Sequence, residues 1–146
     1  MHNEIDNARS DRLRQRMIEH EKHGRCHFCP EGFKSHTNPV IYQNEHWFIA
    51  GNDDPYPGSI HHYLIVSKRH TTQVVYLTDQ EILAQAEAVA WLVKHLEADA
   101  YTILVRSGNM KKTGATLDHI HYHFVCGVEK TGPEHKMIFG PLGYQK

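Results

Sequence analysis

Three histidines alternate with apolar residues in the segment His119-Ile120-His121-Tyr122-His123. Successive side chains of a β-strand point to opposite faces, so a strand here would place the three imidazoles on one face, about 6.6 Å apart. The residues between them would then face the core. Histidine is uncommon in strands and in cores, so three on one face indicate a functional site.

Two kinds of chemistry fit this triplet. Neutral imidazole is a common metal ligand, so the three rings could bind one metal ion. Alternatively, an imidazole with one nitrogen held by a backbone carbonyl presents the other nitrogen as a nucleophile toward phosphorus. Neighbouring imidazoles can then hold phosphate oxygens or protonate a leaving group. The triplet alone leaves both possibilities open.

A second candidate for chemistry is the segment Cys26-His27-Phe28-Cys29. Two cysteines separated by two residues suit a metal site or a redox pair. The chain has three cysteines, and an odd number without a secretory signal argues against a disulfide framework. The third, Cys126, has no evident partner and is expected to be a buried thiol at the end of a strand.

The elements that must position these residues are predicted to form one α+β domain over residues 1–146. We expect an antiparallel sheet of about five strands, one long helix and an N-terminal helix. Residues 1–24 are predicted to be a helical extension and residues 127–146 an irregular tail. The predicted strands cover residues 40–42, 47–50, 63–66, 101–105 and 119–125.

The long helix is predicted over residues 79–97. Thr78 and Glu81 have the spacing of a capping box, which marks its start. Apolar residues then recur with helical periodicity and are predicted to face the sheet. They are Ile82, Ala86, Val89, Val93 and Leu96.

Composition excludes several classes of protein. The hydrophobic fraction is 40% and the net charge is −1, which is typical of a globular protein and too weak a field to attract nucleic acid or an anionic membrane. No apolar run approaches the roughly 20 residues that span a bilayer. The polar first ten residues lack the apolar core of a signal peptide. We therefore expect a cytoplasmic protein with neither a membrane nor a nucleic-acid partner.

Three separated motifs resemble those of the histidine-triad (HIT) family. Residues 114–125, Gly-Ala-Thr-Leu-Asp-His-Ile-His-Tyr-His-Phe-Val, are similar to its signature, and residues 61–70 are similar to its His-x-Leu-Val-Ile-Pro-Lys-x-His strand. Asp54 lies eight residues before His62, where the family has Asp or Asn. Cys26 and Cys29 match the start of many bacterial members. The resemblance covers about residues 26–126.

The resemblance implies a role for each matching residue. His121 would be the nucleophile that forms a nucleotidyl-histidine intermediate, with His123 and His62 around the α-phosphate. Thr116 would offer its hydroxyl to the phosphate or the leaving group. The substrate-binding residues would be Asp54, which would bind the ribose, Asn109, which would stand for the family's Asn-x-Gly, and Trp47 and Phe48. The last two would help form the base pocket, unless they are core residues.

The resemblance also implies a structural zinc ion. Its ligands would be Cys26, Cys29, His70 and His119, a closed tetrahedral set. The alternative is that Cys26 and Cys29 are free thiols. Three nearby histidines could also substitute in the ligand set, namely His27, His36 and His46.

The activity implied is that of a nucleotide hydrolase or nucleotidyl transferase in a homodimer. It would act at the α-phosphate of a purine nucleotide phosphoramidate or phosphoanhydride, such as a dinucleoside polyphosphate. Ala115 replaces a family Gln that contacts phosphate, so a nucleotide-binding module with little catalysis is one alternative. Lys111 and Lys112 could replace that contact or be solvated loop residues. The other alternative is a metal-dependent enzyme that uses the histidine triplet as ligands.

Overall fold

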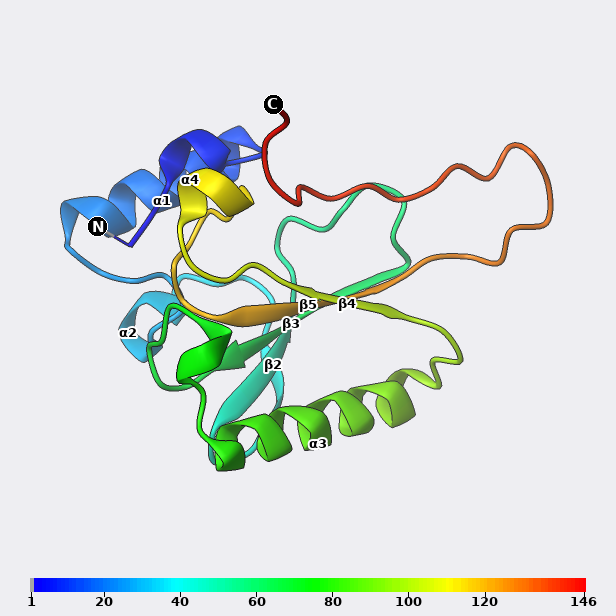
Figure 1. Ribbon diagram of the computed structural model, residues 1–146, viewed down its shortest axis with the longest axis horizontal. Coiled ribbons are helices and arrows are strands. Elements are labelled where there is room, and N and C mark those ends of the chain that lie inside the picture. Colours follow the sequence, from blue (N-terminus) through cyan, green and yellow to red (C-terminus); the bar gives the residue numbers. More distant parts are fainter. Residues whose placement is uncertain (1) are drawn as a thin grey trace.

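The computed structural model describes residues 2–146 as a sheet with helices on both faces (Figure 1). The helices are η1 (Ile5–Asn7), α1 (Asp11–Lys22), α2 (Pro30–Phe33), η2 (Val74–Tyr76), α3 (Asp79–Leu96) and α4 (Met110–Thr113). The strands are β1 (Val40–Gln43), β2 (Trp47–Gly51), β3 (His61–Ser67), β4 (Thr102–Val105) and β5 (His121–Cys126). The expected α+β class is therefore confirmed.

The five strands form one antiparallel sheet in the order β1-β2-β3-β5-β4. The register of the central pair decides what the site contains. Leu64 lies opposite His123, and Val66 lies opposite His121. Because paired residues point to the same face, His62 of β3 also shares the face of the β5 histidines.

The long helix α3 covers one face of the sheet (Figure 1). Thr78 and Glu81 form the predicted capping box. The core between α3 and the sheet includes Ile120 and Phe124, as the alternation of the histidine segment predicts. Other buried members of this core are Trp47, Ile49, Ile65, Ala84, Ala88, Leu92 and Cys126.

The face that α3 presents differs from the predicted one. Ile82 is 49% exposed and Ala86 is also exposed, so the predicted stripe does not face the sheet at its N-terminal end. The fully buried apolar residues of α3 are Ala84, Ala88 and Leu92. The rest of the predicted stripe, Val89, Val93 and Leu96, is partly buried and does pack against the core. Small alanines let the helix approach large side chains such as Trp47 closely. This close packing stabilises the core more than burial of the larger Ile82 side chain would.

The N-terminal segment covers the opposite face of the sheet. A second buried cluster joins Cys26 and Phe28 of this segment to Phe48 of β2 and to Leu64 of β3. Helix α1 begins at Asp11 because Ser10 caps its start, the Ser10 side chain accepting a hydrogen bond from Leu13 N–H (3.1 Å). Gly24, with φ +58°, follows the helix in the left-handed conformation, as a C-terminal stop requires.

The C-terminal tail has neither helix nor strand in residues 127–146, and it returns from β5 to the vicinity of α1 (Figure 1). Two hydrogen bonds hold its end near the sheet. Arg106 Nε donates to Pro141 O (2.7 Å), and the Tyr144 hydroxyl donates to Asn7 Oδ1. None of the helices within residues 2–146 is both long and apolar enough to cross a bilayer.

Candidate active site and metal centre

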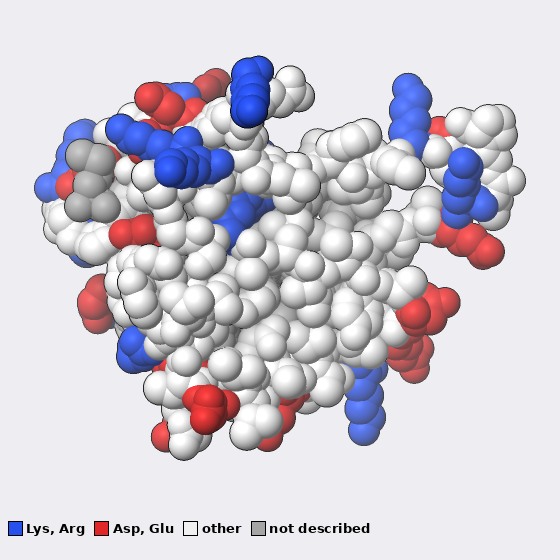
Figure 2. All heavy atoms as spheres, in the orientation of Figure 1, with Lys and Arg blue, Asp and Glu red and all other residues white. Residues whose placement is uncertain are grey.

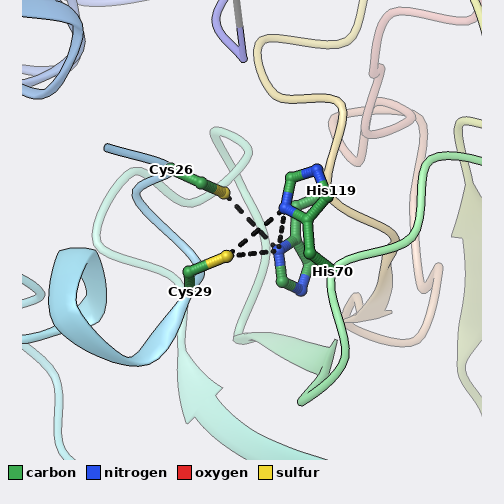
Figure 3. A group of neighbouring side chains, drawn as sticks. All are labelled: Cys26, Cys29, His70 and His119. Carbon is green, nitrogen blue, oxygen red and sulfur yellow. Dashed lines mark hydrogen bonds between the residues drawn. The ribbon is translucent and has the colours of Figure 1, made fainter. Parts of the chain in front are cut away.

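The residues Cys26, Cys29, His70 and His119 converge at one end of β3 and β5 (Figure 3). The Nδ1 atom of His119 lies 3.5 Å from the sulfur of Cys26 and 3.6 Å from that of Cys29. The Nδ1 atom of His70 lies 3.3 Å from the Cys29 sulfur and 3.2 Å from Nδ1 of His119. The chain thus brings together the whole ligand set that the sequence predicted.

These distances fit four ligands arranged tetrahedrally around one metal ion. With metal bonds of about 2.3 Å to sulfur and about 2.0 Å to nitrogen, tetrahedral geometry requires about 3.5 Å between sulfur and nitrogen and about 3.3 Å between nitrogens. His119 Nε2 donates to the Ser67 carbonyl (2.6 Å), so its Nδ1 lone pair faces the cluster. Burial raises the pKa of Cys26 to about 12, so its thiolate needs a cation beside it.

His119 is separated from the other two histidines of the triplet. It precedes β5, and its ring belongs to the cysteine cluster rather than to the pocket of His121 and His123. Within residues 2–146, two groups could hold a metal ion, and neither contains His121 or His123. The structure therefore does not gather the triplet around a single ion.

His121 is oriented by the backbone. Its Nδ1 donates to the His119 carbonyl (2.7 Å), so in the neutral ring Nε2 carries the lone pair. Burial lowers the pKa of His121 to about 4, with Arg106 adding to the effect, so the ring is neutral at pH 7. The Phe28 ring packs edge-on against it with 4.7 Å between centroids.

His62 and His123 form a direct contact beside His121. The Nε2 atom of His62 lies 2.9 Å from Nδ1 of His123, and Tyr56 N–H donates to the other nitrogen of His62 (2.9 Å). Burial, together with the positive charges of Arg9 and Arg106, lowers the pKa of His62 to about 3, and burial also lowers the pKa of His123 well below its ordinary value. Both rings are therefore neutral at pH 7 and are fixed in position.

A pocket opens in front of these rings, between the sheet and the two terminal segments. Figure 2 shows Lys or Arg atoms recessed in a hollow on this side of the molecule. His121, His123, Thr116 and Asp54 all line the pocket, as do four arginines, Arg9, Arg12, Arg16 and Arg106. Asp54 Oδ2 is buried without a hydrogen-bond partner, although the Arg9 guanidinium lies 3.7 Å away.

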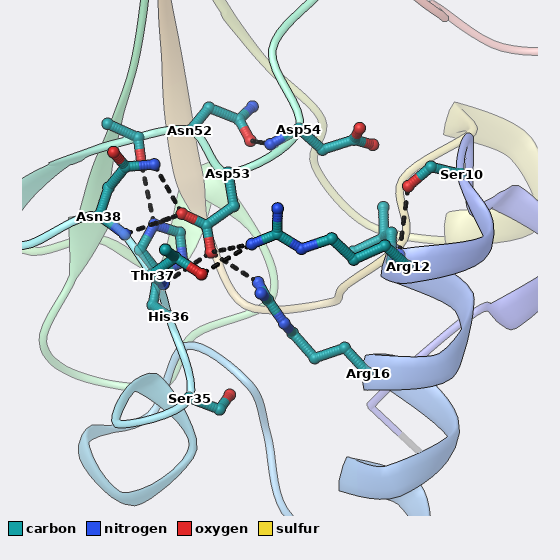
Figure 4. Close-up of polar contacts among 12 residues, drawn as sticks. Ser10, Arg12, Arg16, Ser35, His36, Thr37, Asn38, Asn52, Asp53 and Asp54 are labelled. Carbon is teal, nitrogen blue, oxygen red and sulfur yellow. Dashed lines mark hydrogen bonds and ion pairs between the residues drawn. The ribbon is translucent and has the colours of Figure 1, made fainter.

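Asp53, next to the predicted Asp54, joins α1 to the loop before β1 (Figure 4). Its carboxylate accepts hydrogen bonds from the backbone of Thr37 (2.7 Å) and Asn38 (2.9 Å) and from Arg16 (2.8 Å). Burial alone would raise the pKa of Asp53, but these donors hold it well below its usual range. Asp53 thus holds the arginine-bearing helix over the pocket.

Several residues that the sequence associated with substrate do not line this pocket, and His62 and Lys112 are among them. Trp47 is 0% exposed and donates from Nε1 to Glu81 O (2.7 Å) on the α3 side, so it is a core residue. Phe48 lies in the second buried cluster and does not line the pocket. Asn109 caps α4 by accepting from Lys111 N–H (2.9 Å). Lys111 itself is exposed and does not line the pocket.

Sequence reasoning missed Arg106 and Tyr56, which lie near His62 and His123. The Arg106 Nη1 atom lies 3.1 Å from His123 Nε2, and its other Nη donates to the Tyr56 hydroxyl. A signal for Arg106 does exist. It follows β4, and with Leu104 of β4 opposite His123, residue 106 shares the histidine face by alternation.

Comparison with known families identifies the class of protein. A profile of the HIT domain family matches residues 34–130, which is more than half of the chain. The chain therefore belongs to the HIT domain family. No curated protein matches the sequence.

Solved structures share this fold at low sequence identity. A HIT family hydrolase from Clostridium thermocellum is 23% identical with a TM-score of 0.59, over 75% of this chain and 95% of that chain. A histidine triad nucleotide-binding protein from Candida albicans is 19% identical with a TM-score of 0.58, over 76% and 86%. A diadenosine triphosphate hydrolase from Plasmodium falciparum is 19% identical with a TM-score of 0.52, over 62% of each chain. At these sequence identities, the similarity is evidence of a shared fold.

Proposed function

We propose that the protein is a nucleotide hydrolase or nucleotidyl transferase that acts through a covalent intermediate on His121. One observation carries the proposal. The Nδ1 atom of His121 is held by a backbone carbonyl at 2.7 Å, which leaves Nε2 as a neutral nucleophile in a ring that lines the pocket.

In the first step, Nε2 of His121 attacks the α-phosphorus of the substrate. A phosphorus–nitrogen bond forms, and the bond from phosphorus to the leaving group breaks, with its electron pair going to the leaving group. The proton on Nδ1 stays in its hydrogen bond to His119 O, which stabilises the positive charge on the substituted ring. Water or another acceptor then displaces His121, and water releases the nucleoside monophosphate.

The groups around the pocket support the phosphate and ribose parts of the substrate, and the family resemblance supplies the purine base. His123 and the Thr116 hydroxyl would hold phosphate oxygens or protonate the leaving group, and His62 positions His123. The unpartnered carboxylate oxygen of Asp54 would accept hydrogen bonds from ribose hydroxyls. We propose purine nucleotides with an α-phosphoramidate or a phosphoanhydride, including dinucleoside polyphosphates.

We further propose that the cluster of Cys26, Cys29, His70 and His119 binds a structural zinc ion. Two sulfur and two nitrogen ligands at the tetrahedral distances support zinc, and four protein ligands leave no open position for catalysis. The ion would tie the N-terminal segment to the sheet and hold His119, whose carbonyl orients His121.

A homodimer is proposed from two exposed features. Strand β4 is an edge strand, which pairs with β5 alone within residues 2–146. On α3, Ile82 and Leu83 are 49% and 67% exposed. An open edge strand and exposed apolar residues on a helix are each features that a second copy of the chain can cover.

Adduct formation on His121 tests the proposed function. Wild-type protein incubated with adenosine 5′-phosphoramidate should form an adenylylated species that is labile in acid and stable in base. His121→Asn should lose the adduct and reduce turnover on the order of a thousandfold or more, because the covalent route is removed. Its zinc content should not change.

Two outcomes would contradict this proposal. A His121→Asn variant that loses its metal together with activity would indicate the metal-dependent enzyme. A wild-type protein that binds adenosine monophosphate but turns over no phosphoramidate, dinucleoside polyphosphate or nucleotide sugar would indicate the binding module.

A further inference from the structure

The pair His62 and His123 has more hydrogen-bond donors around it than it can satisfy. Two neutral imidazoles together carry two N–H groups and two lone pairs. Their mutual contact, 2.9 Å between Nε2 of His62 and Nδ1 of His123, uses one of each. One ring N–H and one lone pair therefore remain for every other neighbour.

Three neighbours of this pair are donors. Tyr56 N–H points at Nδ1 of His62 (2.9 Å), and the Asn52 amide nitrogen lies 3.1 Å from Nε2 of the same ring. The Asn52 amide oxygen is already occupied by Asp54 N–H (2.9 Å), so the amide presents its NH₂ group to His62. Arg106 Nη1 lies 3.1 Å from Nε2 of His123, and guanidinium can only donate.

The fixed backbone donor decides where the ring protons lie. Tyr56 N–H takes the lone pair on Nδ1 of His62, so Nε2 of His62 carries a proton and donates to His123. The remaining proton of His123 is then on Nε2, where it faces the guanidinium of Arg106. Both groups are donors, and both residues line the pocket.

Arg106 also differs from the other pocket arginines in charge compensation. Arg9 lies 3.7 Å from a carboxylate oxygen of Asp54, and Arg12 and Arg16 lie 3.8 and 2.8 Å from one of Asp53. Within residues 2–146, Arg106 makes no ion pair within 4.0 Å, and its polar contacts are with the Pro141 carbonyl, the Tyr56 hydroxyl and His123. A positive charge in a recessed position thus has only neutral partners.

We propose that Arg106 and His123 together form an anion site that binds a non-bridging oxygen of the scissile phosphate. A phosphate oxygen would accept from Arg106 Nη1 and from His123 Nε2–H, which removes the donor–donor contact and neutralises the guanidinium. This inference rests on the proposed function, in which His121 attacks the same phosphate. It makes Arg106 a substrate-binding residue and predicts a preference for nucleotides over nucleosides.

Calorimetric binding of adenosine monophosphate, adenosine and inorganic phosphate tests this site. Arg106→Gln should bind the monophosphate and inorganic phosphate on the order of 10- to 100-fold more weakly, since a hydrogen bond to a charged group is lost. Adenosine should bind the variant as it binds the wild type. The affinity of Arg106→Lys for the monophosphate and for phosphate should lie between those of the wild type and Arg106→Gln, because lysine keeps the charge but not the planar fork.

Arg14→Gln is the matched control. It removes the same charge from an arginine of α1 that does not line the pocket, so it should leave all three affinities unchanged. Zinc content and the melting temperature of each variant report whether the fold is kept. Holding the Pro141 carbonyl is a structural role, and its loss would affect adenosine and the monophosphate alike.

Three results would overturn the inference: no binding of phosphate or the monophosphate by the wild type, unchanged affinities in Arg106→Gln, or an equal loss for adenosine. The proposed function fails separately. Phosphate binding that depends on Arg106, without turnover by the wild type, would contradict the hydrolase and leave the anion site standing. Wild-type turnover that survives in Arg106→Gln, with an unchanged affinity for the monophosphate, would contradict the anion site and leave the hydrolase standing.

Discussion

The carbonyl oxygen of His119 accepts the Nδ1–H of His121 at 2.7 Å, while the ring of His119 lies in the Cys26–Cys29–His70 cluster. One residue therefore connects the candidate metal centre to the candidate nucleophile. A change that displaces the His119 ring also moves the carbonyl that holds His121. The two sites are coupled through the backbone, although they share no ligand.

This coupling predicts the effect of removing the metal. We expect about one zinc per chain in the wild type, measured by elemental analysis, and little in Cys26→Ser, because a closed tetrahedral site needs all four ligands. Cys26→Ser should also be less stable to urea and slower in turnover, since His121 loses its fixed orientation. Cys126→Ala, which changes a buried cysteine outside the cluster, should keep its zinc. Full zinc retention in Cys26→Ser would exclude the assigned ligand set.

The pKa of His62 predicts how stability depends on pH. Its folded-state pKa is about 3, below the ordinary value of 6.5, so the unfolded chain binds the extra proton. Stability is therefore lost as pH falls from about 6.5 toward 3. This one residue should contribute about 2 kcal/mol of the loss between pH 7 and pH 5.

Urea denaturation at both pH values measures this effect. The control is His62→Asn, whose Oδ1 can accept from Tyr56 N–H as Nδ1 of His62 does. The variant should show a smaller loss of unfolding free energy between pH 7 and pH 5 than the wild type. An identical loss in both proteins would show that His62 is not the group that titrates.

Removing the negative charge of Asp53 should cause a large loss of stability. Asp53→Asn places an NH₂ group among donors and leaves the charge of Arg16 without its partner. Removing one partner of a buried ion pair costs about 3 kcal/mol or more. The exposed pair of Arg14 and Asp6 gives the comparison, and Asp6→Asn should change stability by less than about 0.5 kcal/mol. Similar unfolding free energies for the two variants would contradict the structural role of Asp53.

The proposed dimer predicts a solution mass of twice the 16.9 kDa chain, measured by light scattering. Ile82→Glu places a charge on the exposed face of α3 and should shift the protein toward monomer at low concentration, because burying an unpaired carboxylate is unfavourable. Its zinc content should stay that of the wild type. A monomer mass for the wild type across a wide range of concentrations would rule the dimer out.

Local patterns in the sequence were enough for much of the fold, and the metal cluster followed from the family resemblance. Alternation placed Ile120 and Phe124 in the core, and the capping box at Thr78 located the start of α3. The spacing of Cys26 and Cys29 indicated a metal site or a redox pair, and the resemblance to the HIT family added His70 and His119; these four residues do lie together. Such inferences succeed because strand alternation, helix capping and ligand spacing are properties of a few neighbouring residues.

Only the tertiary structure decided which groups surround His121. Arg106 comes from the end of β4 and Tyr56 from the loop before β3, and the strand order β3-β5-β4 brings both to His123. Trp47 and Ile82 show the same limit, since the packing of α3 on the sheet buries Trp47 and leaves Ile82 half exposed. No local pattern records these contacts, because they join residues far apart in the chain and depend on sheet order and on the fit of side chains across the core.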